Sequence, residues 1–147
     1  MIQIEKYLKQ RKLQYIVIPL NQVAYTVGDV VDAGIDVDEV VKTLIVRTNK
    51  EFVALALRGK DKLDFKKVRK LFGSKAELAK PEEVLKVVGV PIGAVCPVLI
   101  GIPLYFDKRV LDLKNVHMGS GDLMHGLEMK LVDLLKAVEG YKIEDLV

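Results

Sequence analysis

The chain contains few residues that could do chemistry, and Lys42 is the most informative of them. It lies within an aliphatic stretch, Val40–Val46, that contains no glycine or proline. β-Branched and aliphatic residues favour a β-strand, and alternation puts Lys42 on the same face as Leu44 and Val46. An ammonium among aliphatic side chains is unfavourable unless it reaches water or meets an anion. Lys42 is therefore either a snorkelling strand lysine or a pocket lysine that holds a carbonyl or phosphate oxygen.

The other groups that can bind metal or act as nucleophiles are scattered. His117 and His125 are eight positions apart, and the single cysteine, Cys96, is distant from both. A metal site needs a compact set of ligands, so we predict no metal. Ser120, Asp122 and His125 could form a Ser/His/Asp triad only through a geometry that their spacing does not supply. A buried, unreactive thiol at Cys96 and a surface imidazole at His125 are the simpler interpretations.

Common cofactor motifs are missing from the sequence. The chain has no Walker-type glycine-rich loop followed by Lys and Ser or Thr, and no glycine-rich dinucleotide fingerprint after a strand. We therefore predict no cofactor. An enzyme with this sequence would work without a metal and without a conventional nucleophile.

A basic amphipathic helix is predicted from the spacing of apolar residues between Asp64 and Phe72. The charged residues of such a helix usually form a solvated face, but they can also contact the phosphates of a nucleic acid. The net charge of +3 permits such contact without indicating it. The candidates for backbone contact are Lys66, Lys67, Arg69 and Lys70.

The composition is that of a globular protein. The chain has 147 residues, of which 50% are hydrophobic and 29% charged, and this predicts one domain over residues 1–147. No apolar run approaches the ~18–20 residues that span a bilayer, and the start does not read as a secretion signal. We therefore expect no membrane partner. A single cysteine favours a reducing compartment, so a cytoplasmic location is expected.

Short helices and strands must position the candidate residues. The turn at 48–51 is short enough to join the Lys42 strand to the next strand, 52–57, as an antiparallel hairpin. Thr26 and Asp29 have the spacing of a capping box for a helix that follows. Glycine and proline interrupt residues 89–103, which predicts an ordered loop. Adjacent strand pairs separated by helices predict an α+β fold with a mixed, largely antiparallel sheet and flanking helices.

Several motifs follow one another in a recognisable order. They are Val41-Lys42-Thr43-Leu44-Ile45-Val46, Val53-Ala54-Leu55-Ala56-Leu57, Gly59-Lys60-Asp61-Lys62-Leu63-Asp64, the basic helix, Lys75-Ala76-Glu77-Leu78-Ala79-Lys80-Pro81-Glu82-Glu83-Val84, Gly93-Ala94-Val95-Cys96-Pro97 and Gly126-Leu127-Glu128-Met129. This order resembles the YbaK/ProX-type aminoacyl-tRNA deacylase family, which includes the editing domain inserted in bacterial-type prolyl-tRNA synthetases. The resemblance covers about Thr26 to Leu134 and implies the partly barrel-like α+β fold of that family.

The resemblance also implies roles for individual residues. Lys42 takes the place of the family's essential strand lysine, and Gly93 to Pro97 that of its Gly-x-x-x-Pro pocket loop. Ser120 corresponds to the serine of a late glycine-rich turn in Cys-tRNA(Pro) deacylases, although its spacing to Gly126 differs by one residue. Thr43 stands where some alanine-specific members have Asn. The implied substrate-binding residues are Thr43, Gly93, Ala94, Val95, Cys96, Pro97, Ser120 and Gly121, with Thr26 and His125 as further candidates.

The implied function is a trans-editing hydrolase that cleaves the ester between a wrong amino acid and tRNA(Pro). Such an ester is already activated, so positioning and charge stabilisation suffice, and Lys42 could supply both. A pocket formed by Val95, Cys96 and Val98 suits Ala, Cys or Ser. The expected partners are the acceptor end of an aminoacylated tRNA and an aminoacyl-tRNA synthetase. A non-catalytic module of the same fold that binds tRNA ends or nucleotides is the alternative.

Overall fold

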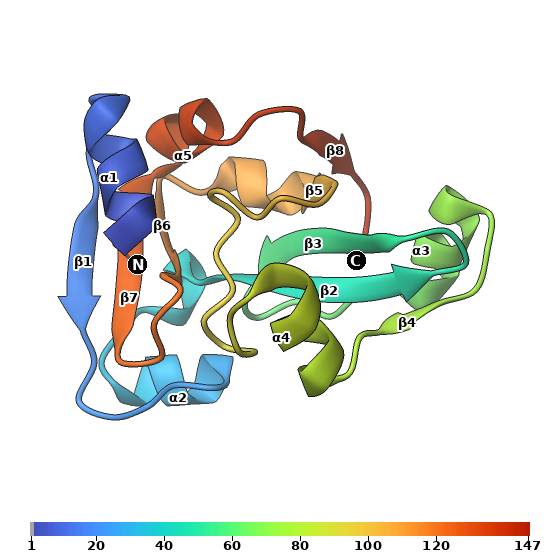
Figure 1. Ribbon diagram of the computed structural model, residues 1–147, viewed down its shortest axis with the longest axis horizontal. Helices are drawn as coiled ribbons and strands as arrows, with labels where there is room; N and C mark the ends of the chain where they lie inside the picture. The colour runs from blue at the N-terminus through green and yellow to red at the C-terminus, as the bar shows by residue number, and fades with distance from the viewer. Residues whose placement is uncertain (1) are drawn as a thin grey trace.

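The computed structural model describes residues 2–147, with side chains from residue 3 onward (Figure 1). Within this range, no helix combines the length and the apolar character that crossing a bilayer requires. The helices are α1 (Ile2–Gln10), α2 (Val27–Asp32), α3 (Phe65–Phe72), α4 (Pro81–Val88) and α5 (Leu131–Ala137), with 3-10 turns at Val37–Glu39 and Lys108–Asp112. The strands are β1 (Ile16–Pro19), β2 (Val41–Thr48), β3 (Phe52–Arg58), β4 (Ala76–Leu78), β5 (Leu104–Asp107), β6 (Asn115–Gly119), β7 (His125–Lys130) and β8 (Lys142–Glu144).

The strands form two sheets. One is antiparallel with the spatial order β1-β7-β6, and the other is mixed with the order β4-β2-β3-β5-β8. β2 and β3 form the predicted antiparallel hairpin, in a register that sets Lys42 opposite Leu57. β5 pairs with β3, and β8 with β5, in parallel. The prediction of an α+β fold with mixed, largely antiparallel pairing is confirmed.

The two sheets meet where β2 begins. An isolated parallel bridge joins Val40, directly before β2, to His117 in the middle of β6. In Figure 1 the β1-β7-β6 sheet stands at the left, and the long β2–β3 hairpin runs from it toward α3 and β4 at the right. The first residues of β2, among them Lys42 and Thr43, therefore lie at the junction of the sheets.

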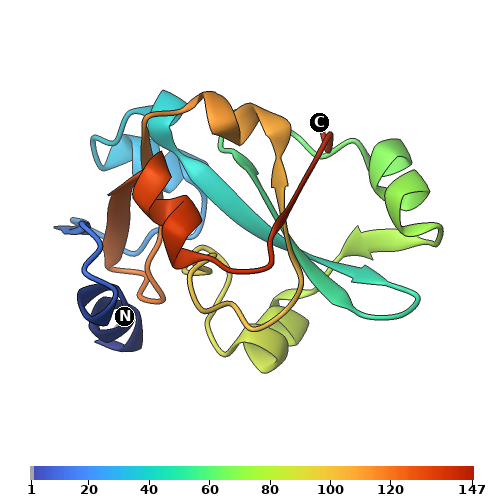
Figure 2. The same cartoon turned by 90° about the horizontal axis from the view of Figure 1, so that it is seen from above.

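Apolar side chains cover both faces of the five-stranded sheet. On one face, Val41 and Ile45 of β2 pack into the larger core together with residues of α1, α4, α5, β6 and β7. On the other face, Val46 packs with Val68 of α3 and with Leu146. Figure 2 shows α3 at the end of the molecule that is remote from α1 and α5. β2 is thus buried on both sides, as its near-continuous aliphatic sequence indicates.

Local sequence signals set the helix boundaries. Thr26 Oγ1 accepts a hydrogen bond from Asp29 N at 3.1 Å, and Asp29 Oδ2 accepts from Thr26 N at 3.2 Å, which completes the predicted capping box of α2. α3 starts after Asp64 and stops at Gly73, whose φ is 62°. Pro81 is the first residue of α4, as predicted. The strand β8, of 3 residues, was not predicted, because it forms through its pairing with β5 and not from a local sequence pattern.

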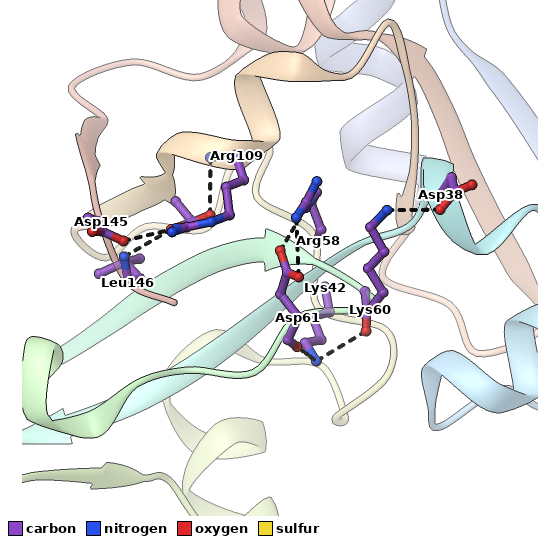
Figure 3. Close-up of polar contacts among 10 residues, drawn as sticks. Asp38, Lys42, Arg58, Lys60, Asp61, Arg109, Asp145 and Leu146 are labelled. Atoms are coloured by element: carbon purple, nitrogen blue, oxygen red, sulfur yellow. Dashed lines mark hydrogen bonds and ion pairs between the residues drawn. The ribbon is translucent and has the colours of Figure 1, made fainter.

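A buried carboxylate ties the end of the chain to the five-stranded sheet (Figure 3). Asp107 is fully buried, and its Oδ1 accepts from Leu146 N at 2.9 Å and from Arg109 Nη1 at 3.0 Å. Arg109 Nη1 also donates to Asp145, whose other oxygen accepts from Lys67 Nζ at 3.0 Å. Arg109 and Lys67 hold the pKa of Asp145 well below its usual range. We call these five residues the Asp107 network.

Candidate active site

A cavity of about 630 Å³ lies at the junction of the two sheets. Its wall is built from α2 and the segment before it, the first half of β2, α4, the 89–103 loop, and the ends of β6 and β7 next to the turn that joins them. The cavity therefore collects residues that are far apart in the sequence. Of the predicted site residues, its wall contains Thr26, Lys42, Thr43, Gly93, Val95 and His125.

Lys42 joins this wall from β2, and its ammonium is held by backbone carbonyls (Figure 3). Nζ donates to the carbonyl of Asp61 at 2.5 Å and to that of Gly59 at 3.3 Å. Both carbonyls belong to the turn after β3, which Arg58 fixes through hydrogen bonds of 2.7 and 3.3 Å to the Asp61 carboxylate. An ammonium has three donors, so two are used here and one remains. The Lys42 head is thus paired with neutral oxygens instead of standing free in water.

The environment of Lys42 also changes its acidity. Desolvation of the half-buried ammonium lowers the pKa of Lys42 from its ordinary value, while the negative charge of Asp61 partly offsets this effect and Lys62 adds to it. A lysine with a lowered pKa loses its charge at a lower pH than an exposed lysine does. It can therefore lose its positive charge at a pH where other surface lysines keep theirs.

The two threonines of the wall use their hydroxyl groups differently. The hydroxyl of Thr26 accepts the capping hydrogen bond from Asp29 N. Thr43 follows Lys42 in β2, and its Oγ1 is buried without a hydrogen-bond partner among the residues that the structure describes. Thr26 therefore shapes the start of α2, whereas the Thr43 hydroxyl is buried and unpaired.

Two glycines hold the pocket loop between its neighbours. Gly93 has a φ of 87°, and a Cβ on it would lie 2.7 Å from the Cα of Tyr25. On the other side, a Cβ on Gly119 would lie 2.4 Å from the carbonyl oxygen of Val95. Side chains do not fit at either position, so the backbone of the loop lies directly against the segment before α2 and the end of β6. This explains physically why the loop needs glycine at 93.

Other members of the predicted pocket loop support the wall and do not line it. Ala94, Cys96 and Pro97 are buried outside the cavity lining, and the Ala94 carbonyl accepts from Gly121 N at 2.7 Å. Burial raises the pKa of the Cys96 thiol to about 12, so the nucleophilic thiolate does not form near neutral pH. This agrees with the interpretation of Cys96 as a small buried hydrophobe. Among the three apolar residues expected around the aminoacyl group, Val95 lines the cavity, whereas Cys96 and Val98 do not.

Ser120 is fully buried and stabilises the turn between β6 and β7. Its Oγ lies 2.7 Å from the carbonyl oxygen of His125 and 3.1 Å from that of Asp122, and it accepts from Asp122 N at 3.2 Å. In the described structure the hydroxyl therefore bonds to backbone and not to the His125 ring. The three residues do not form a Ser/His/Asp triad.

Asp122 and His125 nevertheless form a pair at the cavity. His125 Nδ1 lies 3.0 Å from Asp122 Oδ2, and both residues belong to the wall. Hydrogen bonds from Met124 N and from the His125 ring lower the pKa of Asp122. A carboxylate that orients an imidazole through one nitrogen leaves the other nitrogen for a ligand or a water molecule. The structure thus brings a partner, Asp122, to His125, which spacing alone did not show.

His117 is a wall residue that sequence reasoning considered only as a metal ligand. It is 2% exposed, lies between Val116 and Met118 in β6, and its Nδ1 has no hydrogen-bond partner within residues 2–147. Burial lowers the pKa of its imidazole. A Cβ on Gly126 would lie 2.3 Å from the ring, so glycine is needed there to admit it. The position of His117 between apolar strand residues was the sequence signal for its burial. Periodicity does not show whether the ring nitrogens of a buried histidine have hydrogen-bond partners.

The basic residues of α3 are remote from the cavity. α3 packs on the Val46 face of the sheet, whereas α4, which lines the cavity, packs on the opposite face. Lys67 is engaged, because its Nζ donates to Asp145 and to the carbonyl of Val147 at 2.6 Å. The guanidinium of Arg69 lies 5.5 Å from the centre of the Phe65 ring. The exposed cations of this helix are Lys66, Arg69 and Lys70.

Metal-ligating side chains do not gather in the part of the chain that the structure describes. Among residues 2–147, no group of three or more His, Cys, Asp or Glu side chains has an arrangement that could hold a metal ion. His117 and His125 both line the cavity, but they lack such a third ligand there. Metal independence itself stays a prediction.

The sequence matches a family model described as the aminoacyl-tRNA editing domain over residues 22–137. A proline–tRNA ligase of Staphylococcus aureus (strain bovine RF122) is 31% identical over 119 residues, which are 80% of this chain and 21% of the ligase. The proline–tRNA ligase of Macrococcus caseolyticus is 28% identical over 120 residues, with the same coverage of 80% and 21%. The chain thus spans about a fifth of the length of these ligases.

Solved structures show the same fold as independent chains of similar length. A hypothetical protein superposes with a TM-score of 0.84 at 28% identity, over 97% of each chain. A protein proposed to be a trans-editing enzyme for prolyl-tRNA synthetase superposes with a TM-score of 0.81, also at 28% identity, over 99% of this chain and 94% of that one.

Proposed function

This chain belongs to the aminoacyl-tRNA editing domain family, and on that premise we propose that it is a trans-acting, metal-independent deacylase. Its substrate would be a tRNA, in the first place tRNA(Pro), that carries a small wrong amino acid such as alanine, cysteine or serine. The reaction would be hydrolysis of the ester between that amino acid and the terminal ribose. The observation that carries the proposal is the place of Lys42 among the residues that line a mostly apolar cavity, with its ammonium held by two backbone carbonyls.

Lys42 would stabilise the charge that develops on the carbonyl oxygen of the ester. The carbonyls of Gly59 and Asp61 hold two of its donors, so the direction of the third is fixed before the substrate arrives. Preorganised donors stabilise a developing oxyanion strongly, and removal of one typically lowers the rate by about 10²–10³. Because the aminoacyl ester is already activated, this stabilisation does not need a nucleophilic side chain beside it.

Water would be the nucleophile. Its oxygen bonds to the carbonyl carbon, the ester C–O bond breaks, and the ribose oxygen leaves with the proton that the water gives up. Family resemblance implies that a neighbouring ribose hydroxyl of the substrate assists the attack. His125, oriented by Asp122 at the wall of the cavity, is the protein group suited to relay this proton.

The proposed partner is the acceptor end of an aminoacylated tRNA. Exposed Lys66, Arg69 and Lys70 of α3 would contact its phosphates outside the cavity, while Lys67, which is engaged with Asp145, would contribute less. The related proline–tRNA ligases carry this domain within a much longer chain, so a synthetase that delivers the tRNA is part of the proposal.

The proposal is tested by incubating tRNA(Pro) charged with alanine, cysteine or serine with the protein and with Lys42→Ala. The wild type should release at least one of these amino acids, and Lys42→Ala should release it at least 100-fold more slowly. Lys60→Ala is the matched control, because Lys60 belongs to the same turn but pairs with the exposed Asp38. This control should keep the wild-type rate within about twofold.

Two outcomes would contradict the proposal. If no amino acid is released above background, while the protein binds the tRNA in a salt-sensitive manner, the chain is a binding module of the same fold. If Lys42→Ala keeps full activity, the deacylase does not depend on the Lys42 ammonium and the mechanism above is wrong.

A further inference from the structure

The turn after β3 contains the charged groups that act on the Lys42 ammonium. Asp61 attracts this ammonium and Lys62 repels it. The Asp61 side chain is only 13% exposed, so solvent and salt would screen an ion pair between its carboxylate and Lys42 weakly. In the described structure, however, Lys42 Nζ donates to the carbonyl oxygen of Asp61 and not to its carboxylate. Asp61 thus presents a neutral oxygen to the ammonium, although it carries a negative charge of its own.

Arg58 accounts for this arrangement. Its Nε donates to Asp61 Oδ2 at 2.7 Å and its Nη2 donates to Asp61 Oδ1 at 3.3 Å, so the guanidinium engages both oxygens of the carboxylate. Pairing through two hydrogen bonds fixes the direction of a carboxylate as well as its charge. Figure 3 shows the result, with the Asp61 carboxylate directed at Arg58 and the Asp61 carbonyl at Lys42.

Neighbouring charges leave this pair intact. Asp107 and Arg109 act on the Arg58 guanidinium with opposite signs. The Asp107 carboxylate already accepts hydrogen bonds from Leu146 N and from Arg109. Asp61 is therefore the carboxylate with which Arg58 pairs in the part of the chain that the structure describes.

Backbone contacts fix the same turn against the start of β2. Gly59 N donates to the carbonyl of Val40 at 2.7 Å, and a Cβ on Gly59 would lie 2.7 Å from Cγ1 of Val40. A side chain does not fit there, so the turn lies directly against the strand that carries Lys42. Gly59 also lines the cavity, and its carbonyl accepts the second hydrogen bond of the ammonium. These contacts do not involve the guanidinium of Arg58, so they remain when it is removed.

We infer that Arg58 is a positioning residue, which keeps the Asp61 carboxylate away from Lys42 and so leaves the Lys42 charge available to the substrate. This inference rests on the proposed deacylase function. Without the guanidinium, rotation of the Asp61 side chain would bring its carboxylate to an ammonium that its own carbonyl already contacts. The carboxylate would then neutralise the ammonium, and the ester carbonyl oxygen would have to compete with it for the charge.

The first test measures kcat and KM for release of an amino acid from mischarged tRNA(Pro). Arg58→Met removes the guanidinium but keeps an unbranched side chain, and it should lower kcat by about tenfold or more while KM stays within about twofold. Asp61→Asn keeps the carbonyl and should lower kcat by no more than about threefold. The double variant Arg58→Met/Asp61→Asn lacks the competing carboxylate, so its kcat should return to within about threefold of the wild type.

Arg47→Met is the matched control for the loss of an ion-paired arginine. Arg47 lies in β2 of the same sheet and pairs with Glu77 and Glu83, but it does not line the cavity. Its substitution should leave kcat within about twofold of the wild type. Thermal melting of each variant shows whether a lower rate reflects loss of the fold.

The second test measures the pKa of the Lys42 side chain by NMR titration, which needs no reaction. A carboxylate that pairs with an ammonium favours its charged form. Arg58→Met should therefore raise the pKa of Lys42 by about 1 unit or more, whereas the double variant Arg58→Met/Asp61→Asn should not raise it.

The outcomes separate this inference from the proposed function. If the double variant is as slow as Arg58→Met, or if Arg58→Met keeps the wild-type kcat, the inference is wrong and the deacylase proposal stands. An unchanged pKa of Lys42 in Arg58→Met also contradicts the inference. If the wild type releases no amino acid, the proposed function fails, and the titration alone decides whether Arg58 keeps the Asp61 carboxylate from Lys42.

Discussion

The Asp107 network and the wall of the cavity both contain buried polar side chains. These side chains are hydrogen-bonded in the network, whereas two of them lack a partner at the cavity. In the network, the buried carboxylate of Asp107 accepts hydrogen bonds from Leu146 N, Arg109 N and Arg109 Nη1. At the cavity, Thr43 Oγ1 and His117 Nδ1 are buried without a partner in the described structure. Paired buried groups stabilise a fold, whereas unpaired ones oppose folding.

The two regions also differ in the hydrogen-bond partners of their lysines. Lys67 completes the network by pairing with the carboxylate of Asp145. Lys42 pairs with neutral carbonyls at 2.5 and 3.3 Å and keeps a third donor. An ammonium between carbonyls retains its charge for another partner, while an ammonium on a carboxylate is already neutralised. The same side chain is therefore structural in one place and available for chemistry in the other.

The largest expected effect on stability lies in the network. Asp107→Ala leaves Leu146 N buried without an acceptor and removes a carboxylate from Arg109, so the free energy of unfolding should fall by about 3 kcal/mol. Urea unfolding at neutral pH measures this change. Asp38→Ala is the matched control, because its ion pair with Lys60 is solvent-exposed and should matter little. Equal effects of the two substitutions would show that the network does not stabilise the fold.

A smaller effect is expected from pH at His117. Because burial lowers the pKa of this imidazole below its ordinary 6.5, the unfolded chain binds a proton there that the folded chain does not. The His117 contribution should therefore reduce the free energy of unfolding as the pH falls below about 6.5, by at most about 1.4 kcal/mol per pH unit. Urea unfolding at pH 7, 6 and 5 should show a flatter dependence for His117→Gln. Parallel curves for variant and wild type would exclude His117 as the cause.

The smallest expected change in stability is that of Thr43→Val. Its hydroxyl lacks a partner in the described structure, so a methyl group removes an unsatisfied buried atom, and the free energy of unfolding should stay within about 1 kcal/mol or rise. Thermal melting of the variant beside the wild type measures the change. A loss comparable to that of Asp107→Ala would mean that the Thr43 hydroxyl is paired in solution and that the contrast between the two regions is wrong.

Predictions from the sequence succeeded where neighbouring residues decide the outcome. The capping box of Thr26 and Asp29, the stop at Gly73 and the β2–β3 hairpin all depend on chemistry within a few residues. β8 escaped prediction, because it exists only through its pairing with β5. The contact between Asp122 and His125 was considered only as part of a triad with Ser120, because turn geometry and not spacing brings the two side chains together.

The sequence by itself determined the α+β class, the buried strand that carries Lys42, the ordered loop that contains Gly93 and the family to which the chain is related. Only the tertiary structure decided what the polar groups do. In the folded chain, the Ser120 hydroxyl bonds to the backbone of its own turn, and the Lys42 ammonium donates to two carbonyls. Thr43 Oγ1 and His117 Nδ1, which belong to residues of one cavity wall, have no hydrogen-bond partner in the described structure. The physical reason is that backbone preferences are local, whereas the hydrogen-bond partners of a buried side chain come from segments that meet only when the chain folds.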